Sequence, residues 1–105
     1  MYLRYIYVFY GCEPMALEAL SFAEQGKGCD MVKELYETEN FKINPRGGLI
    51  GAGHPLGATG ISQTIEIVQQ LQNNAGKRQV DKPSIGLVHN MAAAATSSTV
   101  LVLEK

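Results

Sequence analysis

Residues 44–60 read NPRGGLIGAGHPLGATG and hold six of the eleven glycines of the chain. A stretch this rich in glycine and proline indicates a loop that adopts unusual backbone angles or lies against a ligand. Apolar residues then recur at helical spacing, and Thr59 is the residue expected to cap that helix. The segment is therefore predicted to be a glycine-rich loop that leads straight into a helix.

His54 lies inside this loop, directly before Pro55. Proline favours extended backbone angles at the residue before it, and the helix that follows offers unpaired N–H groups and the positive end of its dipole. An imidazole at such a place can act as a general base or donate a hydrogen bond to a developing oxyanion. The other interpretation is a tight structural loop with an incidental surface histidine, and the residues alone leave both open.

The helix after the loop is predicted to end at Gly76 and to have one apolar and one polar face. The apolar face is expected to be buried and consists of Ile61, Ile65, Val68 and Leu71. The polar face is expected to contact water and consists of Ser62, Glu66, Gln69, Gln70 and Asn73.

Two elements are expected near the start of the chain. Residues 2–10 read YLRYIYVFY, and such an aromatic, almost unbroken apolar run is typical of a strand buried on both faces in a parallel sheet. A helix is then expected to begin near Pro14 and to continue until Gly26 and Gly28 stop it.

The remaining elements complete an alternating pattern. Residues 27–40 are polar and acidic, so they are predicted to form a surface excursion with one helical turn around 31–36. Short or β-rich runs at 41–43, 84–88 and 99–103 are predicted to be strands. The order β-α-β-α-β-β favours an α/β fold with flanking helices and a mainly parallel sheet.

Three further residues could carry chemistry. His89 and Asn90 directly follow a buried-looking strand, and ligands of open α/β sheets gather at the carboxyl ends of strands; a polar strand end is the alternative. Cys12 could be a nucleophile or a proton relay, although a cysteine near a helix start more often serves packing. A nucleotide-binding loop is not indicated, because GxGxxG fails at Leu56 and no Lys-Ser/Thr pair follows.

Composition bounds the class of protein. The 105 residues suit one globular domain, with 46% apolar and 18% charged residues. A net charge of −1 lacks the basic footprint of nucleic-acid binding. The two cysteines do not form a disulfide framework or a zinc motif, so no metal is expected. No apolar run reaches the length of a membrane span, so an intracellular, cytoplasmic chain is expected, with the peroxisome or the mitochondrion as the alternative location. The C-terminus lacks an SKL signal for the peroxisome.

The 44–60 segment resembles the NPSGGxxxxGHPxGATG motif of thiolases. The helical residues 16–22, ALEALSF, resemble the ALEALGF segment of the sterol-carrier-protein type of this family, and AGKRQV at 75–80 is similar to the same type. His-Asn at 89–90 matches the pair that stands in that type where other thiolases have the cysteine of a CxG motif. The similarity runs from Glu13 to Lys105.

The resemblance implies an incomplete C-terminal half of the thiolase fold, forming one partial domain over 1–105. It also implies acyl transfer between coenzyme A thioesters, by Claisen condensation or by thiolysis of a 3-oxoacyl-CoA. The coenzyme A thioester would be the substrate, and no permanently bound cofactor is expected. The residues that the resemblance marks as catalytic are His54, His89 and Asn90, with His54 activating a nucleophilic cysteine and helping to form an oxyanion hole. Those expected to contact coenzyme A are Gly53, Pro55 and Gly57.

This chain also differs from the thiolase pattern in several places. The family's nucleophilic cysteine belongs to an N-terminal half that this chain does not contain, so the chain is expected to be inactive alone and to need that half, or to form a homo-oligomer. The family motif HDCF aligns with residues 6–9, where only the phenylalanine agrees, and a glycine-rich turn aligns with Met-Ala-Ala-Ala-Ala at 91–95. The alternative is a non-catalytic remnant that binds acyl-CoA or lipid or docks on a thiolase-like protein.

Overall fold

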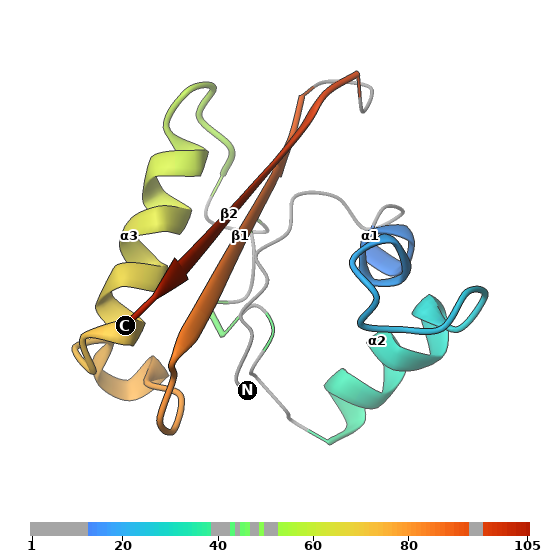
Figure 1. Ribbon diagram of the computed structural model, residues 1–105, viewed down its shortest axis with the longest axis horizontal. Coiled ribbons are helices and arrows are strands. Elements are labelled where there is room, and N and C mark those ends of the chain that lie inside the picture. Colours follow the sequence, from blue (N-terminus) through green and yellow to red (C-terminus); the bar gives the residue numbers. More distant parts are fainter. Residues whose placement is uncertain (1–12, 39–42, 44, 47–48, 50–52, 93–95) are drawn as a thin grey trace.

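The computed structural model describes residues 13–38, 43, 45–46, 49, 53–92 and 96–105. Figure 1 shows the hairpin of β1 (Ile85–Met91) and β2 (Ser98–Glu104) between α3 (Thr59–Leu71) on one side and α1 (Glu13–Ala19) and α2 (Gly28–Glu37) on the other. The elements in chain order are α1 (Glu13–Ala19), α2 (Gly28–Glu37), α3 (Thr59–Leu71), the 3₁₀ helix η1 (Gly76–Arg78), β1 (Ile85–Met91) and β2 (Ser98–Glu104).

Strand β1 separates two small apolar cores. Leu87 packs with Ala16 and Leu17 of α1, whereas Val88 packs with Ile67 and Leu71 of α3. Successive side chains of a strand point to opposite faces, so one apolar run serves helices on both sides. The α/β class predicted from the sequence is confirmed as this helix–sheet–helix arrangement.

The two strands pair antiparallel, with Val88 opposite Leu101. No parallel pairing is present among the described residues, in contrast to the mainly parallel sheet that the sequence predicted. The strand predicted at 2–10 lies outside the described residues, as does most of the one at 41–43. Ile43 itself is described, and it packs on the Leu17 core without belonging to a strand.

Helix α1 ends at Ala19, so the prediction that it continues to Gly26 is wrong. Ser21 adopts a left-handed φ of 61°, and its N–H donates to the carbonyl of Glu18 at 3.0 Å. The N–H of Phe22 donates to the carbonyl of Leu17 at 2.8 Å. These two bonds form a Schellman motif, in which the N–H groups of the left-handed residue and of the residue after it donate to carbonyls near the end of the helix. Phe22 therefore packs on the Leu17 core from a turn and not from a helix.

Helix α2 is longer than the single turn that the sequence predicted. Its first residue, Gly28, is buried and donates its N–H to Glu18 Oε1 at 2.8 Å. A Cβ at this position would overlap the carbonyl oxygen of Pro14, so glycine lets the two helices approach. Met31 and Val32 then pack on the Leu17 core. Tertiary packing therefore stabilises a helix that the polar composition of 27–40 did not predict.

The pKa of the Glu18 carboxyl falls below its ordinary value because it accepts hydrogen bonds from the backbone N–H groups of Gly26 and Gly28. This contact favours the ionised carboxylate, so the link between α1 and α2 weakens once acid protonates Glu18.

Helix α3 exposes residues that were predicted to be buried. Ile61 is 64% exposed and Ile65 is 51% exposed, whereas Glu66 and Gln70, predicted to contact water, are buried. The prediction was correct for Leu71 and wrong for these four side chains. The complete buried set of the helix is Thr59, Gln63, Glu66, Ile67, Gln70 and Leu71.

The buried polar residues of α3 hold the end of η1 and the residues that follow it. Glu66 Oε2 pairs with Arg78 Nη2 at 3.0 Å. Gln70 donates from Nε2 to the carbonyl of Arg78 at 2.9 Å and accepts at Oε1 from the N–H of Val80 at 3.0 Å. A buried polar side chain is stable when its hydrogen bonds are satisfied, which explains how this face can be polar.

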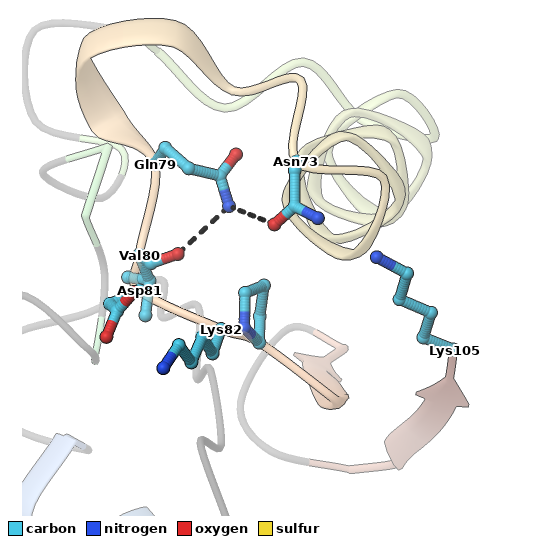
Figure 2. A pocket seen from close by; sticks show the side chains of 7 residues that line it. Asn73, Gln79, Val80, Asp81, Lys82 and Lys105 are labelled. Atoms are coloured by element: carbon cyan, nitrogen blue, oxygen red, sulfur yellow. Dashed lines mark hydrogen bonds between the residues drawn. The ribbon is translucent and has the colours of Figure 1, made fainter.

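The end of α3 is secured by the same segment. Asn73, with φ 57°, provides the left-handed residue that ends the helix, so the helix stops before the predicted Gly76. Figure 2 shows the Gln79 amide directed at this helix end, with Nε2 donating to Asn73 Oδ1 at 3.4 Å and to the carbonyl of Val80 at 3.0 Å. The segment 78–80 is thereby attached along the last two turns of α3.

Candidate functional site

A cavity of about 810 Å³ lies where the loop before α3, the first turns of α3 and the loop end of the hairpin meet. Its lining is mainly apolar, from side chains such as Ile61, Ile65 and Leu101. His54 and Asn90 are polar residues on its wall. A volume of this order and an apolar lining with a few polar groups are typical of small-molecule sites.

Left-handed glycines shape the loop that carries His54. Gly53 and Gly57 have φ values of 79° and 78°, as a loop with unusual backbone angles was predicted to have. The carbonyl of Pro55 accepts hydrogen bonds from the N–H groups of Ala58 at 3.2 Å and Thr59 at 3.3 Å. This turn places His54 beside the first turn of α3.

Thr59 is the first residue of α3, and Ala58 occupies the N-cap position, so the predicted cap is wrong. The Thr59 hydroxyl lies 2.7 Å from His54 Nδ1 and 3.3 Å from the carbonyl oxygen of Pro55. The side chain is buried, with 4% of its surface exposed. Thr59 therefore contacts the histidine of the site and caps no N–H of its own helix.

Asn90 reaches the cavity from β1. Its Nδ2 donates a hydrogen bond to Gln63 Oε1 of α3. A Cβ at Gly60 would lie 3.1 Å from Asn90 Nδ2, closer than side-chain atoms normally pack, so glycine provides the room for this amide. Among the described residues, Gln63 Nε2 is a buried polar atom without a hydrogen-bond partner.

His89 lies apart from this cavity. It is 7% exposed, its Nε2 lies 2.6 Å from Ser98 Oγ on β2, and it does not belong to the cavity lining. Neighbouring residues of a strand face opposite sides, so Asn90 and His89 cannot both point toward α3. The structure thus places His54 and Asn90 on the wall of the same cavity and leaves His89 on the other face of the sheet.

The other residues singled out from the sequence are distributed as follows. Gly57 lines the cavity, whereas Gly53 and Pro55 are exposed in the loop and do not belong to its lining. Cys12 lies outside the described residues. Cys29 is a free, exposed thiol at the start of α2. Within the part of the chain that the structure describes, no group of three or more His, Cys, Asp or Glu side chains could hold a metal ion.

The sequence patterns did not reveal the contributions of Thr59 and Gln63 to the site. Both belong to a polar stripe at helical spacing, which continues through Glu66 and Gln70. A stripe with this period on one face of a helix is the signal that could have revealed them. The isoleucines on another face of the same helix obscure it, because their spacing equally well marks a buried face.

The pH dependence of stability provides a test of the His89 environment. Burial lowers the pKa of the His89 imidazole below its ordinary value. The unfolded chain therefore binds a proton more readily, and the free energy of unfolding should fall as the pH drops below about 6.5. Urea unfolding between about pH 8 and 5 measures this slope. In His89→Gln the slope over this range should be smaller, and an equal slope in both proteins would contradict the assignment.

No helix among the residues described here has both the length and the apolar character needed to cross a membrane.

Comparison with known proteins identifies the family of the chain. Residues 8–105 match the family described as thiolase C-terminal domain-like. The chain is 40% identical over 93 residues to the acetyl-CoA acetyltransferase of Methanothermobacter thermautotrophicus, covering 87% of this chain and 24% of that protein. It is 43% identical over 91 residues to sterol carrier protein 2 of Oryctolagus cuniculus, covering 85% of this chain and 17% of that protein.

A third relative is the beta-ketoadipyl-CoA thiolase of Pseudomonas aeruginosa, which is 35% identical over 75 residues, or 70% of this chain and 18% of that protein. The chain thus spans about a quarter or less of the length of these relatives. The family match covers nearly the whole chain and agrees with the resemblance of the 44–60 segment and with the α/β architecture. The chain therefore belongs to the thiolase C-terminal domain-like family.

Proposed function

We propose that this chain is the C-terminal part of a thiolase-type acyltransferase, which transfers acyl groups between coenzyme A thioesters. The reaction would be Claisen condensation of two acyl-CoA units or the reverse thiolysis of a 3-oxoacyl-CoA. The observation that carries the proposal is that His54 and Asn90 both line one mainly apolar cavity. This pair combines a proton acceptor with an amide donor, as acyl transfer requires.

Each part of the cavity has a role in this proposal. The His54 imidazole takes the proton of a thiol and so generates the thiolate that attacks the acyl carbon. The second N–H of Asn90 Nδ2, beyond the one donated to Gln63, would donate to the oxyanion. The apolar side chains Ile61, Ile65 and Leu101 would contact the acyl chain of the thioester. His89, bonded to Ser98, would support the strand that carries Asn90.

We propose that a thiolase N-terminal half, or another copy of the chain, supplies the nucleophilic cysteine. Ile61, Ile65 and Leu101 are large apolar side chains that are at least partly exposed at the cavity. A partner that supplies the cysteine would cover them, as apolar surface of this kind commonly is covered. The intracellular location expected from the sequence belongs to the same proposal.

Native mass spectrometry of the chain purified from its own source tests this proposal. We expect a complex with a thiolase-like polypeptide, and we expect that complex to cleave acetoacetyl-CoA in the presence of coenzyme A. The isolated 11.4 kDa chain should show no turnover. A lone, inactive species from the native source would argue against an enzyme. Turnover by the isolated chain that His54→Ala abolishes would overturn the need for a partner.

A second function, non-catalytic binding of acyl-CoA or lipid, is favoured by the apolar lining of the cavity. Isothermal titration calorimetry with acetyl-CoA and with a longer acyl-CoA tests it on the isolated chain. Saturable binding that Ile65→Glu weakens and the distant Lys33→Glu leaves unchanged would support this function. The absence of any heat of binding with both thioesters would rule out this second function.

A further inference from the structure

We propose that Thr59 is a positioning residue that holds the His54 imidazole in the tautomer with hydrogen on Nδ1, so that Nε2 is the nitrogen that accepts a proton. The inference deepens the proposed function, because it states which atom of His54 acts as the base. It starts from two distances: 2.7 Å between Thr59 Oγ1 and His54 Nδ1, and 3.3 Å between Thr59 Oγ1 and the carbonyl oxygen of Pro55.

The number of hydrogens in this group decides the direction of each bond. A carbonyl oxygen can only accept, so the bond between Thr59 and Pro55 uses the single hydrogen of the hydroxyl. The Thr59 oxygen is then left with lone pairs for the imidazole. His54 Nδ1 must therefore carry the hydrogen and donate it to Thr59. In a neutral imidazole with hydrogen on Nδ1, the lone pair lies on Nε2.

The surroundings hold the hydroxyl in place. Thr59 is 4% exposed and belongs to the first turn of α3. A threonine in a helix commonly donates to the carbonyl four residues earlier, and here that carbonyl is Pro55. The branched Cβ further restricts rotation of the side chain. The hydroxyl thus acts as a fixed acceptor for His54.

The consequence for His54 can be tested without any enzyme activity. An imidazole in water favours hydrogen on Nε2, so removal of the Thr59 acceptor should shift His54 toward that tautomer. Thr59→Val keeps the size and the branched shape of the side chain but removes the hydroxyl. Thr59→Ser keeps the hydroxyl and serves as the matched control.

The measurement is a long-range ¹H–¹⁵N NMR spectrum of the ¹⁵N-labelled chain at a pH where histidines are neutral. The chain has two histidines, so the His89→Gln variant assigns the signals of His54. We expect the Nδ1–H pattern in the unmodified chain and in Thr59→Ser, and a shift toward the Nε2–H pattern in Thr59→Val. An Nε2–H pattern in the unmodified chain, or no shift in a folded Thr59→Val, would overturn the proposal.

Two further measurements keep the test decisive. If circular dichroism shows that Thr59→Val is unfolded, the tautomer of the unmodified chain and of Thr59→Ser still supports or overturns the inference. In the assembled enzyme, Thr59→Val should lower kcat with little change in KM, and Thr59→Ser should retain kcat. A confirmed tautomer in an assembly without acyltransferase activity would refute the proposed function and leave the role of Thr59 intact.

Discussion

Replacement of His54 by alanine is expected to lower kcat for cleavage of acetoacetyl-CoA by about 10²–10⁴-fold in the assembled enzyme, the range for loss of a general base. His54 is the histidine on the cavity wall. Without it, the thiol of the proposed nucleophilic cysteine stays mostly protonated at neutral pH. Steady-state kinetics of coenzyme A-dependent thiolysis measure the effect. KM should change much less than kcat, because the lost contact acts on the reacting proton.

His89→Gln provides the comparison with a histidine outside the cavity. His89 is bonded to Ser98 on the other face of β1. Its replacement should lower the free energy of unfolding, and kcat should stay close to that of the unmodified enzyme. If His89→Gln removed activity while His54→Ala kept most of it, the assignment of the base to His54 would be wrong.

Replacement of Gly86 by alanine is expected to lower the free energy of unfolding by about 3 kcal/mol, at the upper end of the usual range for overpacking. A Cβ at this position of β1 would overlap Cγ2 of Ile67. Ile67 has no exposed surface and packs with Leu71 and Val88, so a shift that relieved the overlap would disturb this buried packing. Urea unfolding followed by circular dichroism measures the loss.

A double-mutant cycle separates overlap from other effects. Ile67→Ala alone should lower the free energy of unfolding by about 3 kcal/mol, because it opens a cavity. In the double variant, the methyl group introduced at position 86 enters that space, so the total loss should be smaller than the sum of the single losses. Additive losses would show that the two positions do not collide.

Gly26→Ala is the matched glycine control. Gly26 has a φ of 82°, and beyond its own chain neighbours no heavy atom lies within 4 Å of the position that a Cβ would take, so backbone strain is what opposes the alanine. A loss of about 1 kcal/mol is expected, in the range for a left-handed non-glycine residue. A loss as large as that of Gly86→Ala would mean that steric overlap does not explain the effect at Gly86.

Sequence patterns were sufficient where the signal is local. The two strands of the hairpin were predicted from their β-branched residues, but β1 continues past the predicted end at Val88 to Met91, so His89 and Asn90 lie inside the strand and not after it. The left-handed glycines around His54 were expected from the density of glycine in 44–60. Patterns failed where a partner distant in the sequence decides. Glu66 and Gln70 are buried because Arg78 and Val80 satisfy their hydrogen bonds. The spacing of apolar and polar residues does not predict these partners.

The sequence by itself determined the family, the α/β class, the loop that carries His54 and the helix that follows it. Each of these depends on residues close together in the chain, whose backbone preferences act locally. Only the tertiary structure decided that Asn90 and not His89 shares a cavity with His54, and that α3 buries its polar stripe. The face that a strand or helix turns inward depends on what packs against it, because burial is favourable only where apolar groups meet or polar groups find partners.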